Sequence, residues 1–112
     1  RTGRPLADIA RAYFAVGELV GLDWLREAGE SAPASDHWER LAAGSIVEDL
    51  YDQQRELTGM ALAEGGVSAW EQAHATALGR VRELIAEMRG AAVTVPRLGY
   101  VARQIRGLFA SI

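Results

Sequence analysis

The 112-residue chain contains no cysteine and no lysine, and each absence excludes a kind of chemistry. Without cysteine, the chain can form no disulfide, offers no thiol nucleophile and cannot bind zinc or an iron–sulfur cluster through thiolates. All twelve basic residues are arginine, so the segment cannot carry out Schiff-base or lysine general-base catalysis. These two exclusions remove several classes of enzyme before any motif is considered.

Long apolar runs are also missing. No run approaches the roughly 20 residues that cross a bilayer, and the first residues lack the charged, apolar and cleavage regions of a signal peptide. We therefore predict no membrane partner and a cytoplasmic location. The chain begins at Arg1 rather than at methionine, and we interpret it as a segment of a longer protein.

The composition is that of one globular domain. Apolar residues make up 49% of the chain and charged residues 24%, and a chain of this length holds one hydrophobic core, so we predict one domain over residues 1–112. The net charge of −3 and the scattered arginines predict no nucleic-acid partner. Arg97, Arg103 and Arg106 could belong to a DNA-recognition helix, but the apolar stripe through the same segment favours packing.

Apolar residues recur at helical spacing along the whole chain, which predicts an all-α antiparallel bundle of about four to five helices. We expect a helix pair over residues 6–28, divided at Gly21, and a linker over residues 29–35. Further helices are expected over residues 36–64, 69–89 and 96–110. Asp36 with Glu39, and Ser68 with Glu71, have the spacing of capping boxes at two of these helix starts.

Four of the predicted helices have a clear apolar face. On the first helix this face comprises Leu6, Ile9, Ala10, Tyr13, Phe14, Val16 and Val20. On the long helix it comprises Trp38, Leu41, Val47, Leu50, Gln54, Leu57 and Ala61. On the next it comprises Trp70, His74, Ala77, Val81, Leu84 and Met88. On the last it comprises Leu98, Val101, Ala102, Ile105, Leu108, Phe109 and Ile112. Gly44 and Gly59 lie inside the long helix, where they either allow close helix contact or mark a bend.

The sharpest metal-like pattern is Glu71 followed by His74, because helical di-iron sites use Glu-x-x-His to aim two ligands inward. Such a site needs two of these motifs, and the only other histidine, His37, has no glutamate three residues before it. We therefore predict that His74 lines a helix contact. His37 is interpreted as part of a helix start, and we predict no catalytic, cofactor-binding or metal-binding residue in the segment.

Four carboxylates gather on the long helix, and three of them are spaced at four-residue steps along one face. The four carboxylates are Glu48, Asp49, Asp52 and Glu56, with Arg55 beside them, and the four-residue steps join Glu48, Asp52 and Glu56. Such a row could bind a cation or a basic partner, but a charged row opposite an apolar face is more typical of a solvated helix surface.

Two stretches resemble the C-terminal helical region of the large bacterial NAD-dependent glutamate dehydrogenases. The first is ADIARAYFAVGELVGLDWLREA and the second is DHWERLAAGSIVEDLYDQQRELT, and the resemblance covers about residues 6–109. The residues that carry it in order and spacing are Tyr13, Phe14, Gly17, Gly21, Leu22, Asp23, Trp24, Leu25, His37, Trp38, Leu41, Asp49, Leu50, Tyr51, Gln54 and Arg55.

The resemblance implies that the parent protein oxidises L-glutamate with NAD to 2-oxoglutarate, ammonia and NADH, and that it is a homo-oligomer. It also implies that the catalytic lysine and the NAD site of such enzymes lie outside this segment, which contains no lysine. The segment is then a non-catalytic domain with a structural, interdomain or regulatory role. A free-standing helical interaction or regulatory domain without an enzymatic parent is the alternative.

In the first interpretation, the segment docks on the dehydrogenase core of the same chain or of a neighbouring subunit. Large side chains on the first two helices are too many for two short helices to cover alone. We therefore predict that Tyr13, Phe14, Trp24 and Leu25 contact the dehydrogenase core or a neighbouring subunit. Trp38 and Tyr51 on the long helix are further contact candidates.

Overall fold

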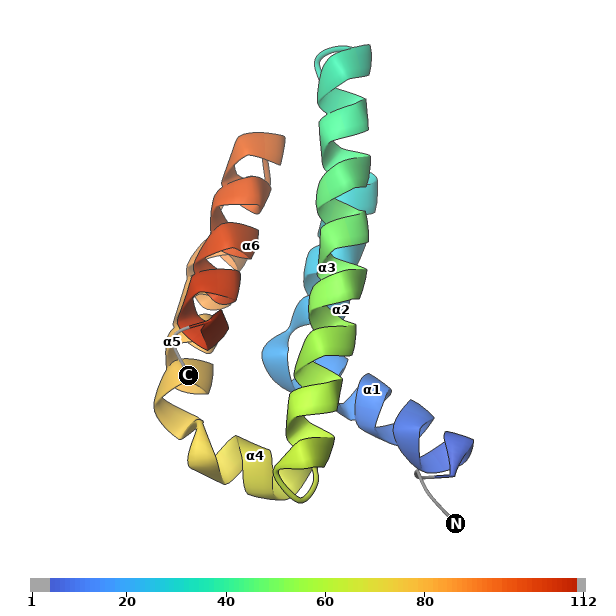
Figure 1. The fold of residues 1–112 in the computed structure, drawn as a ribbon. Coiled ribbons are helices and arrows are strands. Elements are labelled where there is room, and N and C mark those ends of the chain that lie inside the picture. The colour runs from blue at the N-terminus through green and yellow to red at the C-terminus, as the bar shows by residue number, and fades with distance from the viewer. Residues whose placement is uncertain (1–4, 111–112) are drawn as a thin grey trace.

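The computed structural model describes residues 5–110, and six α-helices with no strand make up this range (Figure 1). The helices are α1 (Leu6–Val20), α2 (Leu22–Ser31), α3 (His37–Ala63), α4 (Val67–Ala73), α5 (Ala75–Arg89) and α6 (Val95–Ala110). The predicted all-α class is therefore confirmed. Residue Ile112, at the end of the last predicted apolar face, lies outside the described residues.

Helix α3 is the centre of the arrangement, because α1, α2, α4 and α6 all pack against it. Figure 1 shows α3 running along the whole molecule, with α5 and α6 on one side and the first turns of α1 projecting on the other. The molecule is elongated, with principal extents of 51 × 28 × 21 Å. The start of α3 extends beyond the start of α6, so two parts of the chain, the first turns of α1 and of α3, stand away from the main body.

The helix boundaries differ from the prediction in three places. Helix α2 continues to Ser31, which leaves a shorter connection over residues 32–36. The helix predicted over residues 69–89 is two helices, separated at His74, whose backbone (φ −118°, ψ 30°) is not helical. Ser68 is not a cap, because α4 already begins at Val67 and Gly66 takes the position before it.

The break between α4 and α5 has a physical cause in the packing around His74. Its Nε2 atom lies 2.8 Å from a carboxylate oxygen of Glu64, at the end of α3. Its ring also packs against the Trp70 ring, with 5.9 Å between centroids. Trp70 is fully buried and stacks on Phe109 of α6 at 5.5 Å. Trp70 and His74 thus hold the turn into α5 against α3 and α6.

The predicted cap of α3 is confirmed, since the backbone N–H of Glu39 donates to Asp36 Oδ1 at 2.8 Å. Helix α3 runs without interruption through Gly44 and Gly59, both of which face solvent. A Cβ atom at either position would meet nothing within 4 Å. The idea that these glycines allow close helix contact is therefore wrong.

One hydrophobic core joins all six helices. Its buried members are Val16, Val20, Leu22, Leu25, Leu50, Leu57, Ala61, Trp70, Leu78, Val81, Leu84, Ile85, Met88, Leu98, Val101, Ala102, Ile105 and Phe109. The apolar faces predicted for α5 and α6 are largely confirmed by this list. Only the later parts of the faces predicted for α1 and α3 are buried, because their first turns reach beyond the helices that would cover them.

A buried polar network ties α1, α2 and α3 together around Gln54. This side chain is fully buried, and its Nε2 atom donates to the backbone carbonyl of Tyr13 at 2.7 Å. Its Oε1 atom accepts a hydrogen bond from Arg26, which also donates to Asp23 at 2.6 Å. The Arg26 guanidinium lies 4.4 Å from the centre of the Tyr51 ring. Each polar atom of the Gln54 carboxamide group therefore has a partner on another helix.

Replacing Gln54 with leucine should lower the free energy of unfolding by about 2–4 kcal/mol, because the Tyr13 carbonyl and the largely buried Arg26 guanidinium each lose one hydrogen bond. The matched control is Gln53→Leu, since Gln53 is the adjacent buried glutamine and its Oε1 atom has no partner within the range that the structure describes. We expect this control to change stability by less than about 1 kcal/mol. Urea unfolding followed by circular dichroism measures both. Equal losses for the two variants would contradict a special role for the Gln54 network.

Gly17 should resist substitution for a steric reason. A Cβ atom there would lie 2.4 Å from Gln54 Nε2 and 2.7 Å from Asp23 Oδ1, so the network has to shift. We expect Gly17→Ala to destabilise the chain by about 1–3 kcal/mol. Gly59→Ala is the control, because its site is open and alanine favours a helix by up to about 1 kcal/mol. The same urea titration should show opposite signs, and a neutral Gly17→Ala would refute the packing argument.

Candidate docking surface

Several residues that carry the family resemblance lie at the junction of α1, α2 and α3, whereas His37, Trp38 and Leu41 lie at the exposed start of α3. Gly21 makes the turn between α1 and α2 with a φ of 84°, a conformation that favours glycine. Gly17 leaves room for the Gln54 carboxamide, and Asp23 binds Arg26. Tyr51 supports the same guanidinium from α3. Packing of the junction therefore explains these motif residues.

The prediction that Leu25 contacts a partner is wrong. Leu25 is 0% exposed and belongs to the main core, so it cannot reach a partner. The prediction failed because it assumed that α1 and α2 have to cover their large side chains alone. In the structure α3 packs against both of them, and α6 packs against α2, which provides the missing cover.

Trp24 and Tyr13 are half-buried rather than free. The guanidinium of Arg89 lies 4.9 Å from the centre of the Trp24 ring, and Trp24 also packs against the core. Tyr13 makes an edge-to-face contact with Phe14, with 5.8 Å between ring centroids. These contacts show that both residues contribute to the packing of the chain itself, while part of each side chain stays in solvent.

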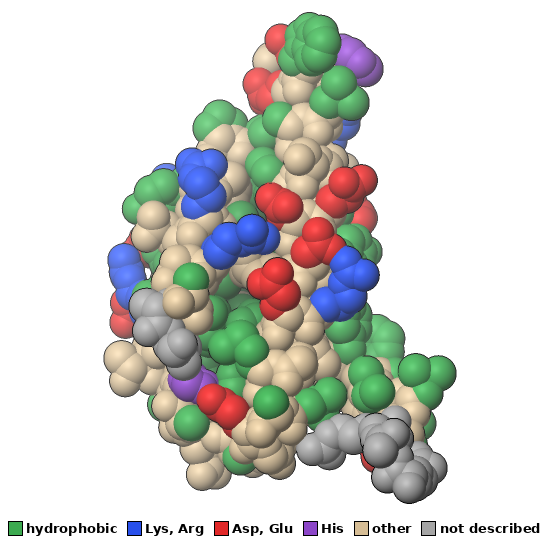
Figure 2. All heavy atoms as spheres, in the orientation of Figure 1, with side chains coloured by type: hydrophobic (Ala, Val, Ile, Leu, Met, Phe, Trp, Pro, Cys, Tyr) green, Lys and Arg blue, Asp and Glu red, His purple; other side chains and the backbone are tan. Residues whose placement is uncertain are grey.

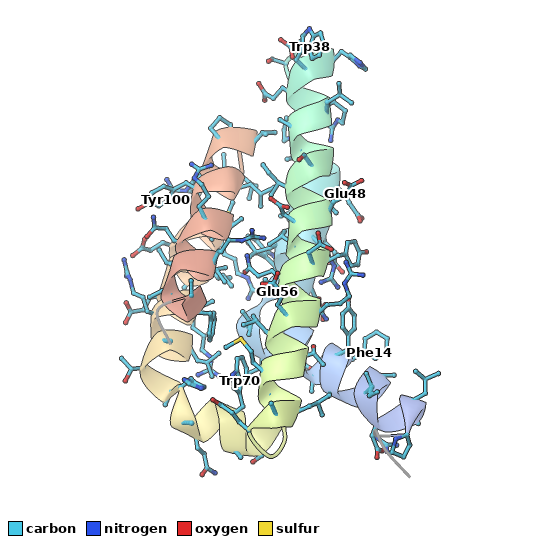
Figure 3. All side chains as sticks on the ribbon, viewed as in Figure 1. Phe14, Trp38, Glu48, Glu56, Trp70 and Tyr100 are labelled. Carbon is cyan, nitrogen blue, oxygen red and sulfur yellow. The ribbon has the colours of Figure 1, made fainter. Side chains whose placement is uncertain are left out.

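Phe14, Trp38 and Tyr51 remain exposed contact candidates. Phe14 is 65% exposed, Trp38 is 76% exposed, and Tyr51 is about half exposed beside Arg26. Figure 3 shows that Phe14 and Trp38 lie far apart, with Phe14 on α1 and Trp38 at the opposite end of the molecule. The exposed aromatic residues therefore belong to separate surfaces.

The larger of these surfaces is the α1 patch, which we define as Leu6, Ile9, Ala10, Tyr13 and Phe14. The three-and-four spacing of these residues places them on one face of α1. Leu6 is 81% exposed, and Ile9, Ala10 and Phe14 are also exposed. Figure 2 shows hydrophobic side chains gathered on this projecting end of the molecule. Leu6 and Ile9 were not among the predicted contact residues, although their position on the apolar face of α1 was a signal for them.

The predicted charged features take ordinary structural roles. His74 binds Glu64, whereas Glu71 lies 3.5 Å from Arg82, so the two residues of the Glu-x-x-His pattern have different partners. The side chain of His74 is mostly buried, as predicted for a residue that lines a helix contact. Residues 5–110 contain no group of three or more histidine or acidic side chains placed to hold a metal ion.

The acidic row of α3 lies on the surface. Glu48, Asp49, Asp52 and Glu56 are all exposed, and Asp52 forms an ion pair with Arg55 one turn along the helix. This agrees with the interpretation of a solvated face. Within the same described range, no helix is long and apolar enough to cross a membrane.

Comparison with known proteins agrees with the motif. A family model described as "Glutamate dehydrogenase, C-terminal" matches residues 1–107. The chain is 33% identical over 101 residues to the NAD-specific glutamate dehydrogenase of Pseudomonas aeruginosa. This alignment covers 83% of this chain and 6% of that protein. It is 31% identical over 109 residues to the NAD-specific glutamate dehydrogenase of Mycobacterium tuberculosis. This second alignment covers 89% of this chain and 7% of that protein.

No solved structure matches the chain significantly. The chain spans about 6–7% of the length of the curated relatives it matches, so nearly all of each relative lies outside the alignment. The family model, by contrast, covers nearly the whole chain. The chain therefore belongs to the family of glutamate dehydrogenase C-terminal domains.

Proposed function

We propose that this chain is a non-catalytic domain of a cytoplasmic homo-oligomeric enzyme that oxidises L-glutamate with NAD to 2-oxoglutarate, ammonia and NADH. The two relatives are both named NAD-specific glutamate dehydrogenases and are far longer than this chain. The chain itself contains no lysine. In this proposal the reacting groups and the NAD site lie elsewhere in the parent, and this domain has a structural, interdomain or regulatory role.

The α1 patch is the docking surface in this proposal, and its exposure is the observation that carries it. Leu6 and Phe14 remain mostly in solvent although the rest of the chain buries a well-formed core. Burying one such side chain completely contributes about 1.5–3 kcal/mol, so covering the patch would stabilise an assembly substantially. The partner is the remainder of the parent protein, within the same chain or in a neighbouring subunit.

The patch is also well positioned for docking. The Tyr13 carbonyl, inside the patch segment, accepts a hydrogen bond from Gln54 of α3. This bond and the packing of Val16 and Val20 fix the second half of α1 to the core. A partner that binds the patch therefore contacts a preformed helix face, which reduces the entropy that docking has to overcome. A contact of this kind changes activity only where it differs between two states of the enzyme.

The double substitution Leu6→Ser with Phe14→Ser tests the docking role in the intact protein. Both side chains are exposed within this domain, so the domain itself should keep its fold. We expect the loss of apolar contact to weaken assembly or to reduce NADH formation from L-glutamate at least tenfold, an effect of about 1.4 kcal/mol. Sedimentation velocity measures assembly, and absorbance of NADH measures the rate.

Tyr100→Ser is the matched control, because Tyr100 is an exposed aromatic residue on α6 outside the α1 patch. It should leave assembly and rate unchanged. If the double variant also behaves like the wild type in assembly, rate and melting temperature, the α1 patch is not a docking surface. A native protein that is small and forms no NADH from L-glutamate would instead support the free-standing interaction domain.

A further inference from the structure

Two adjacent buried glutamines of α3 differ in one respect. Each polar atom of the Gln54 carboxamide has a partner on another helix. Gln53 is only 3% exposed, and its Nε2 atom donates a long hydrogen bond of 3.5 Å to the carbonyl of Ala102 on α6. Its Oε1 atom is buried and has no hydrogen-bond partner among residues 5–110. Because a buried acceptor without a partner is costly, this oxygen calls for a donor from outside the chain's own contacts.

Gln53 lines a cavity of about 190 Å³ between α3 and α6. Ile46, Gly99 and Ala102 supply its apolar wall, and Asp49, Arg103 and Arg106 supply charged groups. None of these three charged residues forms an ion pair or hydrogen bond with the described part of the chain. Figure 2 shows basic side chains of α6 facing acidic side chains of α3 across this junction. The cavity thus combines two free guanidiniums with two free oxygen acceptors.

This combination defines the chemistry of a ligand. Two arginines one helical turn apart favour a carboxylate, which the guanidinium geometry binds through paired hydrogen bonds. Gln53 Oε1 and the Asp49 carboxylate accept hydrogen bonds, so they favour a donor on the same ligand. The carboxylate of Asp49 also disfavours a ligand that carries only negative charge. The cavity has the volume of about six water molecules, which suits a small molecule of similar heavy-atom count.

We propose that the cavity between α3 and α6 binds a small carboxylate that carries a hydroxyl or ammonium group on the adjacent carbon. Arg103 and Arg106 bind the carboxylate, and Gln53 and Asp49 accept hydrogen bonds from the neighbouring donor. The ligand then joins two helices and provides the partner that the Gln53 oxygen lacks. This site shares no residue with the α1 patch and does not depend on the proposed docking role.

Three acids of three carbons provide a matched test, since propionate, L-lactate and L-alanine differ at the second carbon only in carrying hydrogen, hydroxyl or ammonium. Isothermal titration calorimetry of each acid into the intact protein measures its affinity. We expect L-lactate, L-alanine or both to bind at least tenfold more tightly than propionate, because only they donate to Gln53 and Asp49. The stronger of the two identifies whether the ligand is a hydroxy acid or an amino acid.

Substitutions locate that binding in the cavity. The double substitution Arg103→Gln with Arg106→Gln should weaken binding of the preferred acid at least tenfold. Gln53→Leu should reduce its preference over propionate. The control is Arg97→Gln, because Arg97 is an exposed arginine of α6 that does not line the cavity. Any binding elsewhere in the protein is common to the wild type and all variants, so it cancels in the comparison.

Three results would overturn the site. Propionate that binds as tightly as the other two acids would show that the acceptors play no part. Unchanged affinity in the double arginine variant would place any binding elsewhere. Absence of binding by all three acids would show that the cavity takes no such ligand. Because Arg103 and Arg106 are exposed, the double variant should keep its helical circular dichroism spectrum, so that its result can be interpreted independently of Gln53→Leu.

Discussion

The carboxamide of Gln54 is the contact on which the positions of the first three helices depend. Burial without partners would make this group a cost, but here it bonds to Tyr13 on α1 and to Arg26 on α2. Both partners are available only when α1 and α2 lie correctly on α3. The group therefore penalises other arrangements of these helices more strongly than an apolar side chain of equal size does. An apolar side chain makes non-directional contacts and would tolerate small shifts of the helices.

This constraint connects the family motif with the surface of the domain. Gly17 and Asp23 lie close to the carboxamide, and Gly21 provides the left-handed turn that brings α2 beside α1. Fixing this junction also fixes the direction in which the first turns of α1 project from the body (Figure 1). The motif thus determines how an apolar helix face is presented on the surface of the domain.

Local patterns in the sequence predicted the helices well, but they could not predict which apolar side chains the other helices bury. Asp36 caps α3 as its spacing indicated, because a cap depends on residues three positions apart. Leu25 and Phe14 both lie at helical spacing on apolar faces, yet only Leu25 is buried. Which of them is covered depends on α3 and α6, and no local pattern contains that information. The break at His74 likewise depends on Glu64, which lies ten residues away and belongs to another helix.

The two buried glutamines mark the limit of sequence reasoning most clearly. Periodicity placed Gln54 on the apolar face of α3, where a carboxamide costs energy unless other segments supply partners. Those partners lie 41 and 28 residues away, so the sequence could indicate a problem but not its solution. Gln53 poses the same problem without a solution in the described part of the chain, since its oxygen is unpaired there and lies beside a cavity lined by charged residues. Gln54 therefore fixes the positions of three helices, whereas its neighbour Gln53 supports the proposal of a bound ligand that donates a hydrogen bond to it.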